Sequence, residues 1–341
     1  MPRMEVGNAI APAFQHMVRV LFKPFELKKW LALGFITLLA SSGGGGGNYN
    51  FGNWGGRDSD VPGRLSDITS WLLHYWPLLA LGALVIVVLS LILTWLASVF
   101  HMIYIDDITR SSGAIREPFA RLKGIGTSYF LWRLAFGLTV LVLLVTLIGL
   151  PLVWVFLLAR GTGTEAKIAA VVLAVCIGIS LIILSIIIDT FARDFVAPAM
   201  YVRGVGVIAG WRIVLPILRA NVGQVVLYLL LLIALSIGVG LFALLVTVIL
   251  ALIILLPVGG LAFLGYLIGK AAGLTWTIPV IATVATFGLI VGLGFVYLTN
   301  CALQPASAFL RAFSLVVLGQ ADPSLVTVPT GTPPPAPTIQ E

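Results

Sequence analysis

Long apolar runs alternate with short amphipathic stretches along this chain. The runs lie within residues 27–42, 71–105, 129–158, 169–188, 225–268 and 276–298. A helix of about 20 apolar residues spans the roughly 30 Å hydrocarbon core of a membrane. The pattern therefore predicts an all-α integral membrane protein with about six transmembrane helices and amphipathic interfacial helices on the cytoplasmic side.

The amphipathic stretches recur at intervals of roughly 100 residues, as internal repeats do. Each of the first three ends in an apolar residue followed by a basic one: Phe22-Lys23, Leu122-Lys123 and Leu218-Arg219. An aromatic residue, Trp30, Tyr129 or Tyr228, then opens the next apolar run. This spacing predicts quasi-repeats over residues 10–105, 110–200 and 205–304, and a terminal interfacial helix over residues 306–318. Two crossings per repeat would make the copies parallel, although any amphipathic entry to a hairpin could produce the same similarity.

The first amphipathic stretch, residues 14–25, separates aromatic from basic positions. Phe14 and Phe22 fall on one face, and Arg19 and Lys23 fall on the other. Such a helix suits the surface of an anionic leaflet, or it packs against the protein's own helices. The residues expected at the lipid interface are Phe14, Arg19, Phe22, Lys23, Lys28, Lys29, Trp30, Trp211, Arg212 and Arg219.

Two of the apolar runs leave alternatives open. The run over residues 27–42 is about 24 Å long as a helix, which is shorter than the hydrocarbon core. A crossing there must either thin the membrane or begin before the lysines, whose side chains then snorkel to the surface. The rival interpretation is that this run is part of a signal peptide. The run over residues 225–268 is either two crossings or one crossing and a re-entrant piece broken near Pro257.

The domain boundaries follow from the polar segments. Residues 1–320 form the polytopic membrane domain, residues 43–69 form a Gly-rich exposed loop, and residues 321–341 form a Pro-rich disordered tail.

Composition and charge agree with the membrane class. Hydrophobic residues make up 60% of the chain, charged residues 10%, and the mean hydropathy is +1.11, which excludes a soluble protein.

The net charge of +7 does not indicate nucleic-acid binding, because the basic residues lie at membrane boundaries. Fifteen of them fall on one side of a six-crossing topology and five on the other, which places both termini in the cytoplasm. Membrane lipids are the expected partners, and a protein partner or a homo-oligomer stays open.

Few polar groups lie at membrane depth, where charge is costly and often functional. Asp189 and Arg193 have the spacing of an ion pair on one helix face, and proton or ion coupling through Asp189 is the alternative. His101 and Asp106 lack the spacing of a metal site. No catalytic constellation, cofactor site or metal site is therefore predicted, and the functional polar candidates are Asp189, Arg193, Asp194, His101 and Asp106.

Small residues recur in the last two runs. Gly265, Gly269 and Gly273 are spaced by four residues, as are Gly288 and Gly292. This spacing predicts close helix packing inside the protein rather than dimerisation.

Three segments carry a family resemblance. They are Asp194-Phe195-Val196-Ala197-Pro198-Ala199-Met200-Tyr201, the opening Phe22-Lys23-Pro24-Phe25-Glu26-Leu27, and Phe309-Leu310-Arg311-Ala312-Phe313-Ser314-Leu315. Through them the chain resembles uncharacterised bacterial polytopic proteins similar to the membrane domain fused to glycerophosphodiester phosphodiesterases. The resemblance implies a bacterial inner-membrane location and a family-like motif at Asp194, Pro198, Met200 and Tyr201. The catalytic barrel of the fused proteins has no counterpart here, so their activity is not implied.

Three functions remain from the sequence. The first is a non-enzymatic multi-pass protein that organises or senses the bilayer or scaffolds partners. The second is a transporter of a lipid or apolar small molecule, and the third, through the resemblance alone, is a lipid-modifying enzyme.

Overall fold

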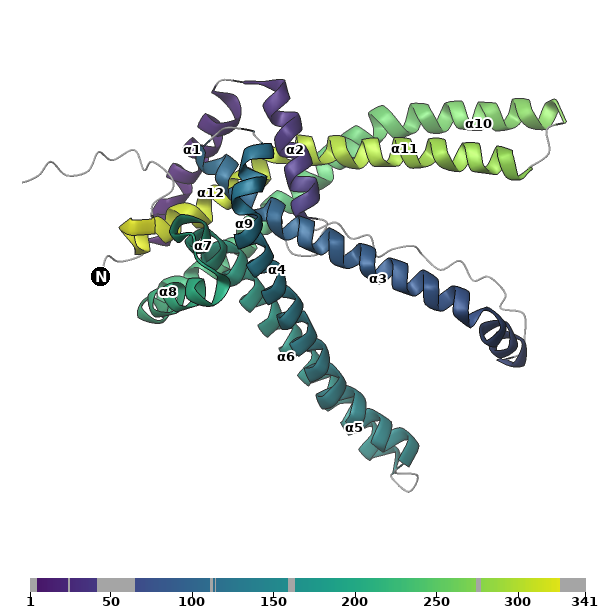
Figure 1. Cartoon of the computed structure of the whole chain (residues 1–341), viewed down its shortest axis with the longest axis horizontal. Coiled ribbons are helices and arrows are strands. Elements are labelled where there is room, and N and C mark those ends of the chain that lie inside the picture. Colours follow the sequence, from purple (N-terminus) through teal and green to yellow (C-terminus); the bar gives the residue numbers. More distant parts are fainter. Residues whose placement is uncertain are drawn as a thin grey trace, which may run out of the picture.

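The computed structural model describes residues 5–23, 25–41, 65–110, 113, 115–158, 163–273 and 277–325, and all regular structure among them is helical. Long helical rods fan out from a compact base (Figure 1). The all-α membrane fold expected from the apolar runs is thus confirmed. The main helices are α1 (Ile10–Phe22), α2 (Leu27–Ser41), α3 (Leu65–Arg110), α4 (Arg116–Leu144), α5 (Leu150–Val153), α6 (Thr164–Phe191), α7 (Ala197–Arg203), α8 (Val207–Ala220), α9 (Val222–Leu250), α10 (Leu256–Ala271), α11 (Ile278–Ala302) and α12 (Gln304–Ala321).

Five continuous helical stretches in the described part of the chain are long and apolar enough to cross a membrane. They are His74–Arg110, Arg116–Phe156, Thr164–Arg203, Val222–Ala271 and Pro279–Ala302. They make three rods: α3, the pair of α4–α5 with α6, and the pair of α9–α10 with α11 (Figure 1). Most large side chains along the rods are exposed, because no other part of the described chain covers them.

The run over residues 27–42 forms helix α2 of 15 residues. At 1.5 Å per residue α2 is about 22 Å long, so it falls short of the roughly 30 Å hydrocarbon core. It lies against α3 and α11. Five full-length spans and one short helix therefore stand where six crossings were expected.

Three π-helical turns precede three prolines inside the rods. Val145–Gly149 precedes Pro151, Ala192–Val196 precedes Pro198, and Ala251–Leu255 precedes Pro257. A proline lacks the N–H of the helical ladder and its ring clashes with the preceding turn, and a widened turn accommodates both effects. One helix runs from Val222 to Ala271, so the structure shows neither the re-entrant piece broken near Pro257 nor the two separate crossings that were the alternatives for residues 225–268.

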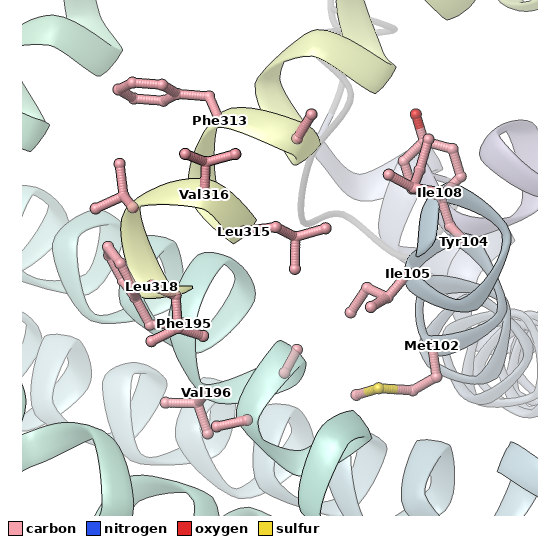
Figure 2. Packing of buried hydrophobic residues seen from close by; sticks show 14 of the residues in the cluster. Met102, Tyr104, Ile105, Ile108, Phe195, Val196, Phe313, Leu315, Val316 and Leu318 are labelled. Carbon is pink, nitrogen blue, oxygen red and sulfur yellow. The ribbon is translucent and has the colours of Figure 1, made fainter. Parts of the chain in front are cut away.

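Helix α12 is the centre of the base. Every side chain from Arg311 to Leu318 is buried, so the terminal interfacial helix expected over residues 306–318 is instead a core helix. Its sequence explains this, because Phe313, Leu315 and Val316 point in different directions around the helix and all need apolar cover. Figure 2 shows Leu315 pointing toward Ile105 and Met102 of α3, whereas Phe313 points away from α3; all belong to one cluster with Phe195 and Val196.

Helix α1 packs along α12. Its buried face carries Ala13, Met17, Val20 and Leu21, so the alternative that α1 packs against the protein's own helices is confirmed for this face. Phe14, however, is 55% exposed. The second amphipathic stretch differs, since residues 116–122 form the first turns of α4 rather than a separate helix.

Two segment boundaries also differ from expectation. Residues 65–69, assigned to the Gly-rich loop, belong to α3. Residues 321–325, assigned to the tail, are described as well: Ala321 ends α12 and Pro323–Leu325 form a 3-10 turn. The rest of these two segments, residues 43–64 and 326–341, lies outside the described residues.

Close glycine packing occurs in the base and is absent at four of the five predicted glycines. A Cβ atom on Gly265, Gly273, Gly288 or Gly292 would meet nothing within 4 Å. Gly265 lies on α10, Gly273 lies two residues past the end of α10, and Gly288 and Gly292 lie on α11, all in the rod that extends away from the base (Figure 1). A Cβ atom on Gly126 would instead lie 2.7 Å from the Cα atom of Val99, where α4 crosses α3.

Candidate functional site

The most concentrated polar chemistry of the described residues lies inside the base, around Asp194. The Nε atom of Arg193 lies 3.0 Å from Oδ1 of Asp194. The hydroxyl of Tyr228 on α9 donates a hydrogen bond of 2.9 Å to Oδ2. The Nη1 atom of Arg311 on α12 lies 3.7 Å from Oδ1. One buried carboxylate thus joins the end of the second rod, the start of the third rod and α12.

Arg311 is the second centre of this cluster and is only 8% exposed. Its Nη1 donates a hydrogen bond of 2.8 Å to the carbonyl oxygen of Arg193. Its Nη2 lies 3.3 Å from Nε2 of His101 on α3. Its Nε has no hydrogen-bond partner within the described part of the chain. Burial lowers the pKa of Arg311, and the Asp194 carboxylate opposes that change.

Aromatic rings enclose the polar groups. The ring of His101 stacks on Tyr129 of α4, with centroids 5.5 Å apart, and Tyr228 stacks on Phe313, with centroids 5.6 Å apart. The edge of Phe195 meets Tyr228. We call His101, Tyr129, Arg193, Asp194, Tyr228 and Arg311 the hub. Because its members come from all three rods and from α12, the hub fixes the rods to one another.

A second ionic cluster surrounds Asp106 near the end of α3. Its Oδ1 lies 3.1 Å from Nε of Arg110 and 2.6 Å from Nη2 of Arg121. The hydroxyl of Tyr201 donates a hydrogen bond to the same oxygen. The arginines reach solvent, whereas Asp106 is buried. This cluster ties α3 to the first turns of α4 and to α7.

A third polar contact links the last helix to the first. The side-chain amide of Gln304, at the start of α12, donates a hydrogen bond to the hydroxyl of Thr37 on α2. Together the three sites connect Asp106 with Arg121, Asp194 with Tyr228, and Gln304 with Thr37. These contacts join α3 to α4, the end of the second rod to α9, and α12 to α2.

The predicted polar candidates are distributed unevenly over these sites. His101, Arg193 and Asp194 belong to the hub, and Asp106 centres the second cluster. Arg193 pairs with Asp194 rather than with Asp189, because the π-helical turn Ala192–Val196 displaces the spacing of an ordinary helix. Asp189 lies half-buried one turn before the hub.

The residues of the family-like motif lie in the base, where they make packing and polar contacts. Pro198 and Met200 are buried, and Tyr201 binds Asp106. Arg311 was not among the predicted candidates. The sequence does contain a signal for Arg311, because it is the lone charged residue in the helix Gln304–Ala321. A single charge in an apolar helix needs an oppositely charged or hydrogen-bonding partner.

The expected interfacial residues divide into exposed and buried groups. Arg19, Lys23, Lys28, Arg212 and Arg219 are exposed, and Trp30 and Trp211 are half-buried. Lys29 is buried, and its Nζ donates a hydrogen bond of 2.6 Å to the carbonyl oxygen of Val20. The expectation that Lys29 contacts lipid is therefore wrong, because the lysine caps the end of α1.

A family of unknown function, DUF7544, matches residues 4–328. The chain belongs to this family. The matched range contains all twelve helices, so the hub, the Asp106 cluster and the rods are parts of the DUF7544 domain. No curated protein and no solved structure matches the chain.

The hub is suited to holding helices together. Its two guanidinium groups face one carboxylate, and each side of that carboxylate already accepts a donor within the base. No group of three His, Cys, Asp or Glu side chains in the described ranges could hold a metal ion. The arrangement therefore acts as an electrostatic clamp between helices that are otherwise apolar.

Proposed function

We propose that this DUF7544 membrane protein is a non-enzymatic scaffold that organises the bilayer around it. The base holds the three rods in fixed directions, and lipid fills the space between them. One observation carries this proposal: the most apolar 18-residue windows of the five spans are 0–6% buried inside the protein. Surfaces of that kind need an apolar solvent along their length.

The contrast between rods and base supports the same function. Polar contacts join the three rods where they enter the base, whereas their far parts diverge (Figure 1). A solute pathway is favoured by polar side chains along a bundle interior. In this chain the hub, the Asp106 cluster and the Gln304 contact all lie in the base instead.

The charge distribution supports an orientation for the scaffold. Exposed basic residues such as Arg19, Lys23, Arg212 and Arg219 lie on the base, whereas Lys167 and Lys270 lie near the far ends of the rods. Under the positive-inside rule the base faces the cytoplasm. We place the protein in the bacterial inner membrane with both termini on the cytoplasmic side.

The two other functions have less support. The transporter hypothesis drew on the quasi-repeats and on a break near Pro257, and the helix that contains Pro257 is continuous. The enzyme hypothesis draws only on the resemblance to the membrane domain of the fused phosphodiesterases. Both become outcomes of the test rather than parts of the proposal.

The test uses the full chain in proteoliposomes with a spin-labelled lipid. Diverging rods expose more surface than a closed bundle, so we expect more motionally restricted lipids per protein than a closed six-helix bundle would hold. The same vesicles should show no uptake of solutes when a proton gradient is imposed. Uptake that Asp189→Asn abolishes would replace the scaffold with a transporter, and turnover of a phospholipid would replace it with an enzyme.

A further inference from the structure

The elbow between α1 and α2 carries an exposed aromatic surface that the hub and the rods do not use. Phe22 is 44% exposed, Phe25 59% and Leu27 64%. Lys23 and Lys28 are also exposed within the same seven residues, and Arg19 lies one turn before them on α1. We define the elbow surface as Arg19, Phe22, Lys23, Phe25, Leu27 and Lys28.

Contacts from the start of α2 hold the elbow surface in place. Lys29 and Trp30, at the start of α2, donate hydrogen bonds of 2.6 and 2.9 Å to the carbonyl oxygens of Val20 and Leu21. These bonds satisfy backbone acceptors that the end of α1 leaves without helical donors. Trp30 also meets the rings of Phe22 and Phe25, with centroids 5.5 and 5.6 Å away. The exposed rings are therefore fixed in place, and little conformational entropy would be lost when they are covered.

The position of the elbow follows from a contact with a membrane span. The hydroxyl of Tyr297 donates a hydrogen bond of 2.9 Å to the carbonyl oxygen of Leu31, in the first turns of α2. Tyr297 lies five residues before the base end of α11, which finishes at Ala302. Leu31 therefore lies beside the end of the apolar span of α11, and the elbow surface ends about one helical turn before Leu31 in the chain.

We propose that the elbow surface binds the anionic headgroup region of the leaflet next to the base. Phe22, Phe25 and Leu27 enter the boundary between headgroups and acyl chains. Arg19, Lys23 and Lys28 bind the phosphate groups above them. Aromatic and basic side chains on one rigid surface match a leaflet that is apolar below and negatively charged above.

This inference rests on the proposed membrane scaffold, since it needs the base to lie at a leaflet. It adds a lipid class to that function. The hub and the rods do not depend on it, so its failure would leave the scaffold standing.

The test measures lipid preference with two matched pairs of exposed basic residues. The purified full chain is titrated with phosphatidylglycerol and with phosphatidylcholine, and the bound lipids are counted by native mass spectrometry. Lys23→Gln with Lys28→Gln should lower the preference for the anionic lipid about fivefold per charge. Arg116→Gln with Lys123→Gln, which removes two exposed charges from the base end of α4, should leave it nearly unchanged.

A depth measurement keeps the inference falsifiable if the lysine variant folds poorly. A nitroxide attached at Phe25→Cys, in a chain with Cys176→Ser and Cys301→Ser, should be accessible to oxygen and protected from a water-soluble nickel complex. A label accessible to the nickel complex would overturn the proposal. Equal losses in both double variants would also overturn it, because the preference would then come from the overall charge of the base.

Discussion

Arg311 donates a hydrogen bond of 2.8 Å to the carbonyl oxygen of Arg193, 118 residues earlier in the chain. That oxygen is available because of Pro198. In the π-helical turn Ala192–Val196 the N–H of Ala197 bonds to the carbonyl of Ala192. The next bond of that register would run from residue 198 to Arg193, and proline has no N–H to donate. The second rod therefore presents a free acceptor to α12.

Removal of the Arg311 charge should destabilise the base. We expect Arg311→Met to lower the free energy of unfolding by about 3 kcal/mol, because Asp194 loses a buried partner and the Arg193 carbonyl loses its donor. Unfolding in mixed detergent micelles measures the change. Arg212→Met, which removes an exposed arginine from α8, is the control and should change it by less than about 0.5 kcal/mol. Equal stability of the two variants would show that the hub does not hold the rods.

Glycine packing gives a second prediction. Gly126→Ala should lower the free energy of unfolding by about 1–3 kcal/mol, because the new Cβ atom would lie 2.7 Å from the Cα atom of Val99 and would push α4 away from α3. Gly288→Ala is the matched control, since its Cβ atom would meet nothing within 4 Å. The control should be neutral or slightly stabilising, because alanine is the better helix former. The same unfolding assay compares them.

The sequence predicted the helices because a membrane span depends on a local property, the length of an apolar run. The helices α1 and α8 could also be predicted from a local property, the helical spacing of their apolar positions. The sequence misplaced the close glycine contacts, because a four-residue spacing shows only that one face of a helix carries small side chains. Which helix packs against that face is decided by the tertiary structure. Gly126 has no small partner four residues away, yet it has the close contact.

The hub was predicted in part. His101, Arg193 and Asp194 were recognisable as charged or polar groups at the ends of apolar runs. Their partners were not, because Arg311 lies more than 100 residues from each of them in the chain. The burial of α12 was also missed, since one basic residue in an apolar helix is compatible with both an interfacial position and a buried ion pair.

The two adjacent lysines of the elbow should behave differently. Lys29→Met should lower the free energy of unfolding by about 1–2 kcal/mol, because the carbonyl oxygen of Val20 would lose its buried donor. Lys28→Met, one residue earlier and exposed, should have an effect near zero. The pair differs only in burial, so unfolding measurements on both separate the capping role of Lys29 from the general effect of losing a positive charge. A similar loss in both variants would contradict that role.

The buried histidine of α1 predicts a dependence on pH. Burial lowers the pKa of His16, whose Nε2 donates a hydrogen bond of 2.9 Å to the carbonyl oxygen of Ile108. The unfolded chain therefore binds a proton near pH 6.5 more readily than the folded one does. The stability contributed by neutral His16 is complete above that pH and is lost as the pH falls below it. His16→Gln retains a donor and does not titrate.

The difference in stability between the native chain and His16→Gln isolates this effect from other titrating groups. Unfolding free energies measured from pH 8 to pH 5 should converge or cross as the pH falls, with the native chain losing more. Parallel curves would show that His16 does not change its protonation on unfolding.

The last prediction concerns the number of crossings. Helix α1 packs on α12, so the two lie on the same side of the membrane, which requires an even number of crossings between them. Only five full-length spans are described, and α3 runs from the far end of its rod toward the base (Figure 1). We therefore predict that α2, although it has only 15 residues, supplies the sixth crossing. Reporter fusions after Gly163 and Gly273 should report the outer side, and fusions after Gly204 and Leu325 the inner side. An outer-side signal after Leu325 would contradict the six-crossing topology, because α1 and α12 could then not meet.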